Sequence, residues 1–370
     1  MLRQAPAMGQ IPAMMKAWAL FAPDDLRPVT KPVPRPDLAE ALVKVEAVAI
    51  CGTDLEILHR GLPAMVDGKP PFDCQHVIGH EYAGTVVAVG STVDEFSIGD
   101  RVVAEVHAGC GRCERCREGM YTSCLNYSNR AKGHRANGFT TDGAFAEYAL
   151  NHVNTLFPLP AHISFEEATL VVTAGTSMYG LDVLGGLIAG EGVVVTGPGP
   201  IGLLGVAVAK ALGADPVILT GTRDRRLELG KKLGADHVVN ARREDAVAAV
   251  RRITNGRGVH FVVECSGAPE ALNQAAQMVN RGGRICLAAF PQHPVPVDLA
   301  SLARNNIYVF GIRGEGQSAT HRAMALMKQR RFDARLIHTH TFSLDELPTA
   351  LRYARERIDD AIKVVVKAKC

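Results

Sequence analysis

The sequence predicts a two-domain α/β protein in which a doubly wound parallel sheet follows a compact domain of short strands. An apolar strand, a glycine-bearing turn and an apolar helix succeed one another over 193–212, as in the first half of a βαβ unit. Strand and helix patterns then alternate as far as residue 312, which is typical of a parallel sheet with helices on both faces. Before residue 160, short β patterns separated by glycines favour a barrel-like domain.

These patterns predict the domain boundaries. We expect a disordered lead-in over 1–14, a barrel-like domain over 15–165 that is completed by 315–370, and the doubly wound domain over 166–314. The first domain takes the strand patterns at 41–50, 84–89, 101–106 and 362–366. The second takes those at 193–196, 216–220, 237–239, 259–263, 284–289 and 307–312.

Composition excludes several classes of protein. The 370 residues are 47% hydrophobic and 21% charged, with a net charge of +3, which describes a soluble globular protein and gives no reason to expect nucleic-acid binding. No apolar run is long enough to cross a membrane, and the first ten residues lack the apolar core of a signal peptide. We therefore expect a cytoplasmic protein. The nine cysteines are an odd number, with four in one short loop, which favours metal binding over disulfides.

The turn after the strand at 193–196 predicts a dinucleotide site. Gly197, Gly199 and Gly202 stand in Gly-x-Gly-x-x-Gly spacing around Pro200 and Ile201. The first glycine permits the tight turn, the second lets a pyrophosphate approach the backbone, and the third lets helix and strand pack closely. The helix N-terminus then offers free N–H groups to the phosphates. A plain strand–turn–helix is the alternative.

A four-cysteine loop predicts a structural zinc site. Cys110, Cys113, Cys116 and Cys124 lie within one irregular, glycine-bearing segment. Four thiolates at this spacing satisfy tetrahedral zinc and leave no open coordination position. An iron–sulfur cluster or four reduced free thiols are the alternatives.

Four motifs in order identify a family. These are Cys51-Gly-Thr-Asp54, Gly79-His80-Glu81-Tyr-Ala-Gly84, the four-cysteine loop and Gly197-Pro-Gly-Pro-Ile-Gly202. With them the chain resembles, from Met15 onward, the zinc-containing medium-chain dehydrogenases and reductases that act on alcohols, polyols and threonine. The resemblance implies a GroES-like catalytic domain, a Rossmann domain, and hydride transfer between NAD(P) and a secondary alcohol or polyol and its carbonyl compound. It also implies a homodimer or homotetramer that pairs the strand at 307–312 between subunits.

The resemblance places a catalytic zinc at Cys51 and His80. A thiolate and an imidazole at strand ends are the mixture expected of such a site. A metal there lowers the pKa of a bound hydroxyl, as it lowers that of water from about 15.7 to about 7. Thr53 stands where the family keeps a hydroxyl that contacts the substrate oxygen and begins a proton relay. A buried apolar thiol and a core histidine are the alternatives for the two ligands.

Glu56 is a departure from the family, which usually has histidine three residues after that hydroxyl. A carboxylate can still pass a proton, but its unperturbed pKa is about 4.3 rather than about 6.5. Glu56 is therefore either a relay group with a different pH profile or a solvated side chain.

The third metal ligand is a more serious departure. The family has Cys, Glu or Asp there, whereas the matching position holds Thr173, or Val172 if the register shifts by one. Neither is a zinc ligand. Glu81 can then coordinate directly beside Cys51, His80 and a water; the weaker reserves are Cys74, His76 and Glu105. A weak or substoichiometric metal site is the remaining alternative.

The end of the second Rossmann strand indicates the type of nicotinamide cofactor. NAD-binding domains place an acid there for the ribose 2′-hydroxyl, but this chain has Gly221 followed by Thr222 and Arg223. Those side chains suit a 2′-phosphate, and Arg226, one helical turn on, can face the adenosine ribose. NADP is favoured, and NAD remains the alternative if the arginines are incidental.

Two other functions stay open from the sequence. A family member without catalytic zinc reduces enones or quinones by direct hydride transfer, which Thr173 favours and Cys51 with His80 oppose. A non-catalytic dinucleotide-binding protein would bind cofactor without turnover. The substrate itself is not identified by the sequence.

Overall fold

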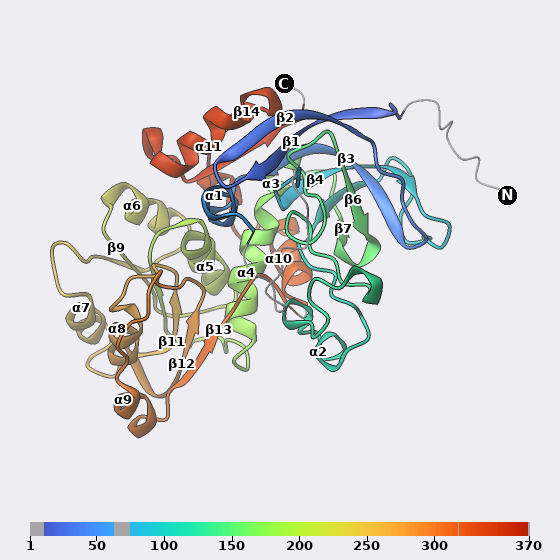
Figure 1. The fold of residues 1–370 in the computed structure, drawn as a ribbon. Coiled ribbons are helices and arrows are strands. Elements are labelled where there is room, and N and C mark those ends of the chain that lie inside the picture. Colours follow the sequence, from blue (N-terminus) through green and yellow to red (C-terminus); the bar gives the residue numbers. More distant parts are fainter. Residues whose placement is uncertain (1–10, 63–74, 317, 369–370) are drawn as a thin grey trace. The chain divides into compact units, whose positions relative to one another are not determined.

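A computed structural model describes residues 11–62, 75–316 and 318–368 (Figure 1). The expected disordered residues of the lead-in therefore lie largely outside the described residues. The chain divides into two compact units, Met1–Val172 with His338–Cys370, and Thr173–Ile337. No helix in the described part of the chain has the length and apolar character needed to span a membrane.

The first unit is built on a seven-stranded sheet in the order β14-β15-β3-β4-β5-β7, with β6 also paired to β3. Its strands are β3 (Glu40–Ala49), β4 (Glu81–Val89), β5 (Arg101–Ala104), β6 (Tyr148–His152), β7 (Leu156–Pro158), β14 (His338–Ser343) and β15 (Lys363–Lys367). A separate hairpin joins β1 (Met14–Ala22) to β2 (Asp25–Pro32). The helices are α1 (Gly52–Arg60), α2 (Glu114–Arg117), α3 (Phe165–Ala168) and α11 (Leu347–Glu356).

The central strand β3 explains why this sheet is stable. Most of its side chains are buried, because an apolar run of this length has partners on both faces. Around it lies a core that includes Val43, Tyr82 and Phe145. The Tyr82 hydroxyl donates to Asn151 Oδ1 over 2.6 Å, so the buried phenol keeps a hydrogen-bond partner.

The second unit is a six-stranded parallel sheet in the order β10-β9-β8-β11-β12-β13, the strand order of dinucleotide-binding domains. Its strands are β8 (Val193–Thr196), β9 (Val217–Gly221), β10 (His237–Asn240), β11 (Val259–Glu264), β12 (Val279–Leu287) and β13 (Tyr308–Gly311). Its helices are α5 (Pro200–Ala211), α6 (Asp224–Lys232), α7 (Ala246–Ile253), α8 (Ala271–Met278), α9 (Leu299–Arg304) and α10 (Ala319–Lys328). The strand order reverses at β8, where a ligand crevice is expected.

The sequence predicted every strand of this parallel sheet, but the boundary between the units differs from expectation. Helix α4 (Leu170–Asp182) carries the chain into the second unit. Residues 315–337, which were expected to return to the first unit, belong to the second. The reason is that α10 packs against α5 and buries Ala323 and Met327. The second unit therefore includes one more helix after its last strand, and the chain returns to the first unit only after that helix.

Asp142 holds the segment that leads into β4. Its carboxylate accepts hydrogen bonds from Val77 N over 3.0 Å and from Lys31 Nζ over 2.5 Å, and it lies 3.2 Å from His76 Nδ1. Burial works to raise the pKa of Asp142, but His76, Lys31 and the Val77 N–H outweigh burial and lower that pKa from 3.8 to about 2.

We expect Asp142→Asn to reduce stability at neutral pH and the deficit to vanish in acid. A carboxyl with a lowered folded pKa stabilises the fold above its unfolded pKa, and that contribution is lost as the pH falls through the folded value. The difference in the free energy of unfolding between Asp142→Asn and wild type should therefore shrink between pH 3.8 and pH 2. Urea unfolding followed by Trp18, the only tryptophan, reports the first unit. A difference that stays constant with pH would contradict this.

Candidate functional site

Cys51, His80 and Glu81 come together at one end of the sheet of the first unit. Each offers one ligand atom, and these three atoms lie within 4.8 Å of one another. The antiparallel register pairs Ala49 of β3 with Glu81 of β4, and Cys51 follows β3 as the residue before α1. Two neighbouring strand ends therefore bring together a thiol, an imidazole and a carboxylate. This donor set fits a divalent zinc ion.

Asp54 orients the residues of this cluster through hydrogen bonds. The carboxylate, fully buried, accepts hydrogen bonds from Cys51 N over 2.9 Å and from Gly79 N over 3.2 Å. It also accepts from His80 Nδ1 over 3.1 Å. With Nδ1 as the donor of that bond, Nε2 is the ring nitrogen left to bind a metal. Burial works to lower the pKa of His80, but Asp54 and Cys51 outweigh burial and hold that pKa well above its usual value.

Thr53 and Glu56, which the sequence placed in the proton relay, lie on α1. Cys51 Sγ is 3.7 Å from Thr53 Oγ1, so the hydroxyl borders the cluster. Glu56 is half-buried and accepts from Arg60 Nη1 over 3.5 Å, one helical turn along. This contact agrees with the solvated alternative for Glu56.

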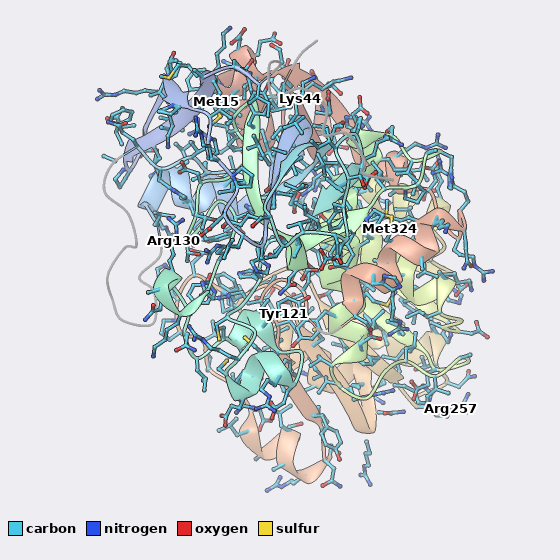
Figure 2. All side chains as sticks on the ribbon, turned by 90° about the vertical axis from the view of Figure 1, so that its right-hand side faces the viewer. Met15, Lys44, Tyr121, Arg130, Arg257 and Met324 are labelled. Atoms are coloured by element: carbon cyan, nitrogen blue, oxygen red, sulfur yellow. The ribbon has the colours of Figure 1, made fainter. Side chains whose placement is uncertain are left out.

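The structure brings Glu81 into the cluster, and the reserve ligands lie elsewhere. His76 Nε2 contacts Gly138 O and His76 Nδ1 contacts Asp142. Glu105 accepts from the hydroxyl of Tyr121, which is labelled in Figure 2. Cys74 lies outside the described residues. Val172 and Thr173 are both buried, but neither side chain carries a thiol, imidazole or carboxylate.

Lys363 is a residue of the site that the sequence reasoning missed. It begins β15, only 2% of its side chain is exposed, and it forms an ion pair with Glu81 Oε2. Burial works to lower the pKa of Lys363, but Glu81, Cys51 and Asp54 outweigh burial and raise that pKa, so the ammonium stays charged. A lysine at the start of a buried run of valines is the signal that could have drawn attention to it.

The four cysteines of the loop also form one cluster. Cys110 Sγ and Cys116 Sγ are 3.9 Å apart, and Cys113 Sγ and Cys124 Sγ are 4.0 Å apart. Four sulfurs about 2.3 Å from a tetrahedral zinc ion would lie about 3.8 Å from one another. Sulfur separations of this size, without a disulfide among these cysteines, fit a zinc ion.

Hydrogen bonds to sulfur favour the thiolate of Cys110, whereas burial raises the pKa of Cys116 and of Cys124. Cys110 Sγ accepts from Asn126 Nδ2 over 3.2 Å and from Cys113 N over 3.4 Å. Burial works to raise the pKa of Cys110, but these donors and the Arg112 N–H outweigh burial and lower that pKa to about 6. The thiolate is the form that binds metal.

The glycine turn of the second unit has the geometry that the sequence predicts. Gly197 has φ +83, and a Cβ at Gly202 would lie 2.1 Å from Gly197 O, so helix and turn pack closely. A Cβ at Gly199 would meet nothing within 4 Å. Open space at that glycine is what a pyrophosphate needs to approach the backbone. Pro200 is the first residue of α5, and Ile201 O accepts from Ser177 Oγ over 2.9 Å, which anchors the helix start.

The end of β9 carries no acid directed at a ribose. Gly221 is its last residue, and a Cβ there would lie 2.5 Å from Pro198 Cδ. The nearby carboxylate of Asp224 is engaged by Asn240 Nδ2 over 2.7 Å and by Arg243 Nη2 over 2.5 Å. Thr222 is exposed, Arg223 half-buried and Arg226 buried.

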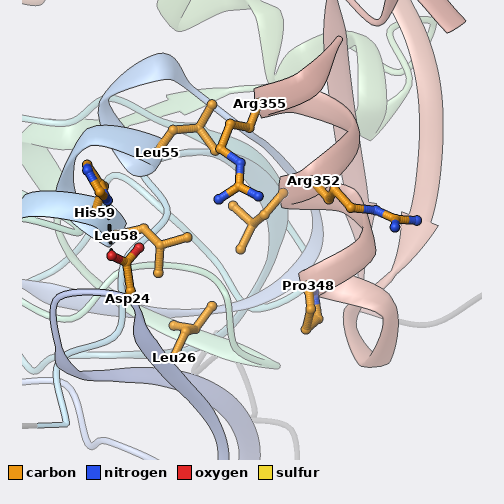
Figure 3. Close-up of a pocket in the computed structure, with 9 residues that line it drawn as sticks. Asp24, Leu26, Leu55, Leu58, His59, Pro348, Arg352 and Arg355 are labelled. Carbon is orange, nitrogen blue, oxygen red and sulfur yellow. Dashed lines mark hydrogen bonds and ion pairs between the residues drawn. The ribbon is translucent and has the colours of Figure 1, made fainter. Parts of the chain in front are cut away.

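A groove in the first unit lies elsewhere on α1. It has a volume of about 500 Å³ and is open to solvent between α1 and α11 (Figure 3). Leu55 and Leu58 form part of its floor, and the His59–Asp24 pair lies at its edge. None of the residues predicted for the metal or the cofactor lines it.

Comparison with known proteins adds two family matches. Residues 37–161 match the alcohol dehydrogenase GroES-like domain, and residues 200–329 match the zinc-binding dehydrogenase domain. The chain is similar to sorbitol dehydrogenase of Bacillus subtilis, with 34% identity over 96% of this chain and 98% of that protein. It is also similar to L-threonine 3-dehydrogenase of Pyrococcus abyssi, with 44% identity over 76% and 78% of the two chains.

A solved structure agrees with these matches. A protein of Sinorhizobium meliloti assigned as a zinc-binding dehydrogenase, solved with NADP bound, superimposes with a TM-score of 0.84. It is 29% identical, and the match covers 96% of this chain and 100% of that one.

We expect Asp54→Ala to destabilise the first unit by roughly 2–5 kcal/mol, because three donors at this buried carboxylate lose their acceptor. Urea unfolding followed by Trp18 fluorescence measures the effect. Asp345→Ala, which removes an exposed carboxylate, should leave the transition unchanged. An equal shift in both variants would contradict the organising role of Asp54.

Proposed function

Because this chain belongs to the zinc-containing medium-chain dehydrogenases, we propose that Cys51, His80 and Glu81 hold its catalytic zinc. The chain is a zinc-dependent oxidoreductase that uses NAD(P) to interconvert an alcohol or polyol and its carbonyl compound. The observation that carries the assignment is the approach of these three ligand atoms to within 4.8 Å. It supports Glu81 as the ligand that replaces the residue missing at Val172 or Thr173.

Each protein group has a defined role in this proposal. A zinc ion in the site acts as a Lewis acid on the oxygen that is oxidised or reduced. Asp54 keeps the proton of His80 on Nδ1, which fixes the orientation of the imidazole. Thr53, whose hydroxyl borders Cys51, accepts the hydroxyl proton of the alcohol and passes it toward solvent. The turn at Gly199 and the N-terminus of α5 hold the phosphates of the cofactor.

We assign the four-cysteine loop a second, structural zinc. Four sulfurs complete a tetrahedral shell, so no position remains for substrate. The support is the pair of sulfur separations of 3.9 and 4.0 Å.

Metal content and turnover together test both sites. We expect about two zinc ions per wild-type chain and about one in either Cys51→Ser or Cys124→Ser, by mass spectrometry of the purified proteins. Cys51→Ser should fold and bind NADP(H) but lose oxidation of secondary alcohols that carry a neighbouring polar group. Sorbitol and L-threonine, the substrates named for its relatives, are the first to assay. One zinc in both wild type and Cys51→Ser would contradict the catalytic site.

We propose NADP as the preferred cofactor. Gly221 leaves the ribose position without an acid, and Asp224 is held by Asn240 and Arg243. Thr222 and Arg223 then supply a hydroxyl and a guanidinium for the 2′-phosphate, with Arg226 beside the ribose. The NADP of the Sinorhizobium meliloti structure also supports this.

We expect Arg223→Ala to weaken NADP+ binding roughly tenfold to a hundredfold, because a charge-assisted hydrogen bond to phosphate is lost. NAD+ binding should change little. Calorimetric titration with each cofactor measures both affinities. Arg257→Ala, which removes an exposed arginine of the same unit (Figure 2), is the matched control. Equal losses for NAD+ and NADP+ would contradict the assignment.

We also propose that the protein is a homodimer or homotetramer joined through β13. This strand is an edge of the parallel sheet, and 61% of Tyr308 and 36% of Val309 are exposed on it. An unpaired edge with exposed apolar side chains favours pairing with a second copy.

A further inference from the structure

The ion pair between Lys363 and Glu81 stands out because both partners are buried. Their side chains are 2% and 5% exposed, whereas the other lysine of β15 that forms an ion pair, Lys367 with Glu166, is 36% exposed. Ionised groups are rarely buried unless they are paired. Removing one partner from a buried pair is strongly destabilising, because it leaves an uncompensated charge. Glu81 thus depends on a cation beside it.

The backbone fixes this arrangement. Val365 of β15 pairs with Ala49 of β3, which pairs on its other side with Glu81. Ile50 N donates to Val364 O over 2.9 Å, so the register continues and sets Lys363 opposite Cys51. Side chains in one cross-strand row, or two residues along it, share a face of the sheet. The ammonium therefore lies on the face that carries Cys51 and Glu81.

The same carboxylate thus serves two cations. Lys363 contacts Glu81 Oε2, and Glu81 also belongs to the cluster with Cys51 and His80. Without a metal, the ammonium alone balances the buried carboxylate within the pair. When zinc is present, two cations lie beside the single negative charge of Glu81. The ammonium and the zinc ion then repel each other at close range.

We propose that Lys363 is an internal counter-ion that competes with the catalytic metal for Glu81 and so weakens the binding of that metal. Lys363 is a positioning residue in this role, since it acts through Glu81. The inference rests on the proposed zinc site at Cys51, His80 and Glu81. It has a consequence opposite to that of an ordinary supporting residue: removing Lys363 strengthens metal binding.

Zinc retention measures this directly. Full-length wild type and Lys363→Met are dialysed against increasing concentrations of EDTA, and the zinc that Cys51→Ser retains is subtracted to isolate the catalytic site. We expect Lys363→Met to hold this zinc about tenfold more tightly or more, because the metal-free state has lost the counter-ion of a buried carboxylate. Zinc should also raise the melting temperature of Lys363→Met more than that of wild type. Unchanged or weaker retention would overturn the proposal.

Two controls separate occupation of Glu81 from the loss of a positive charge. Lys367→Met removes a lysine from the same strand and should leave retention unchanged, and Lys363→Arg, which keeps the charge, should resemble wild type.

The second test uses Glu81→Gln with and without Lys363→Met, which also serves if the single Lys363→Met variant does not fold. In the Glu81→Gln background, we expect Lys363→Met to change zinc retention by less than about threefold.

The outcomes distinguish the inference from the site on which it rests. Tightening of equal size in the Glu81→Gln background would show that Lys363 acts only by repulsion through space, and it would overturn the competition for Glu81. If wild type held no zinc that depends on Cys51, the metal site itself would be refuted.

Discussion

The first unit depends on the antiparallel pairing of β3 with its neighbours. β4 lies along one edge of β3, and β6 and β15 share the other edge. A slip of one residue in such a sheet would turn every side chain to the opposite face. Because the register is fixed, residues from three distant parts of the chain meet at one end of the sheet. Cys51, Glu81 and Lys363 owe their proximity to this pairing.

The charged groups at this end of the sheet are held by hydrogen bonds and by an ion pair. Asp54 lies behind the cluster, where it holds the N-terminus of α1, the strand end at Gly79 and the His80 ring together. Lys363 faces Glu81. Hydrogen bonds between buried polar groups make a region rigid. Hydrogen bonds within the first unit therefore orient the side chains of the site without any contribution from a metal or a substrate.

Local sequence patterns predicted a large part of this site. Cys51, His80 and the four cysteines stand at short, specific spacings, and the glycine turn follows a recognisable strand, so each could be found from neighbouring residues. Lys363 could not, because its partner is on a strand far away in the sequence and only the sheet register brings them together. Glu81 was one of several candidates, and the structure separates it from His76 and Glu105 by their hydrogen bonds. Residues 315–337 were assigned to the wrong unit, because the sequence pattern of a helix indicates its apolar face but not the element that packs against that face.

The contact between Gly221 and Pro198 restricts how this chain could evolve. Any side chain at 221 would begin about where the proline ring already lies, since a Cβ there would be 2.5 Å from Pro198 Cδ. An acid that recognises an unphosphorylated ribose thus has no room until the turn between β8 and α5 is also rebuilt. A change of coenzyme by this route would need paired substitutions rather than one. A lineage with this turn would therefore tend to retain its coenzyme while its substrate pocket diversifies.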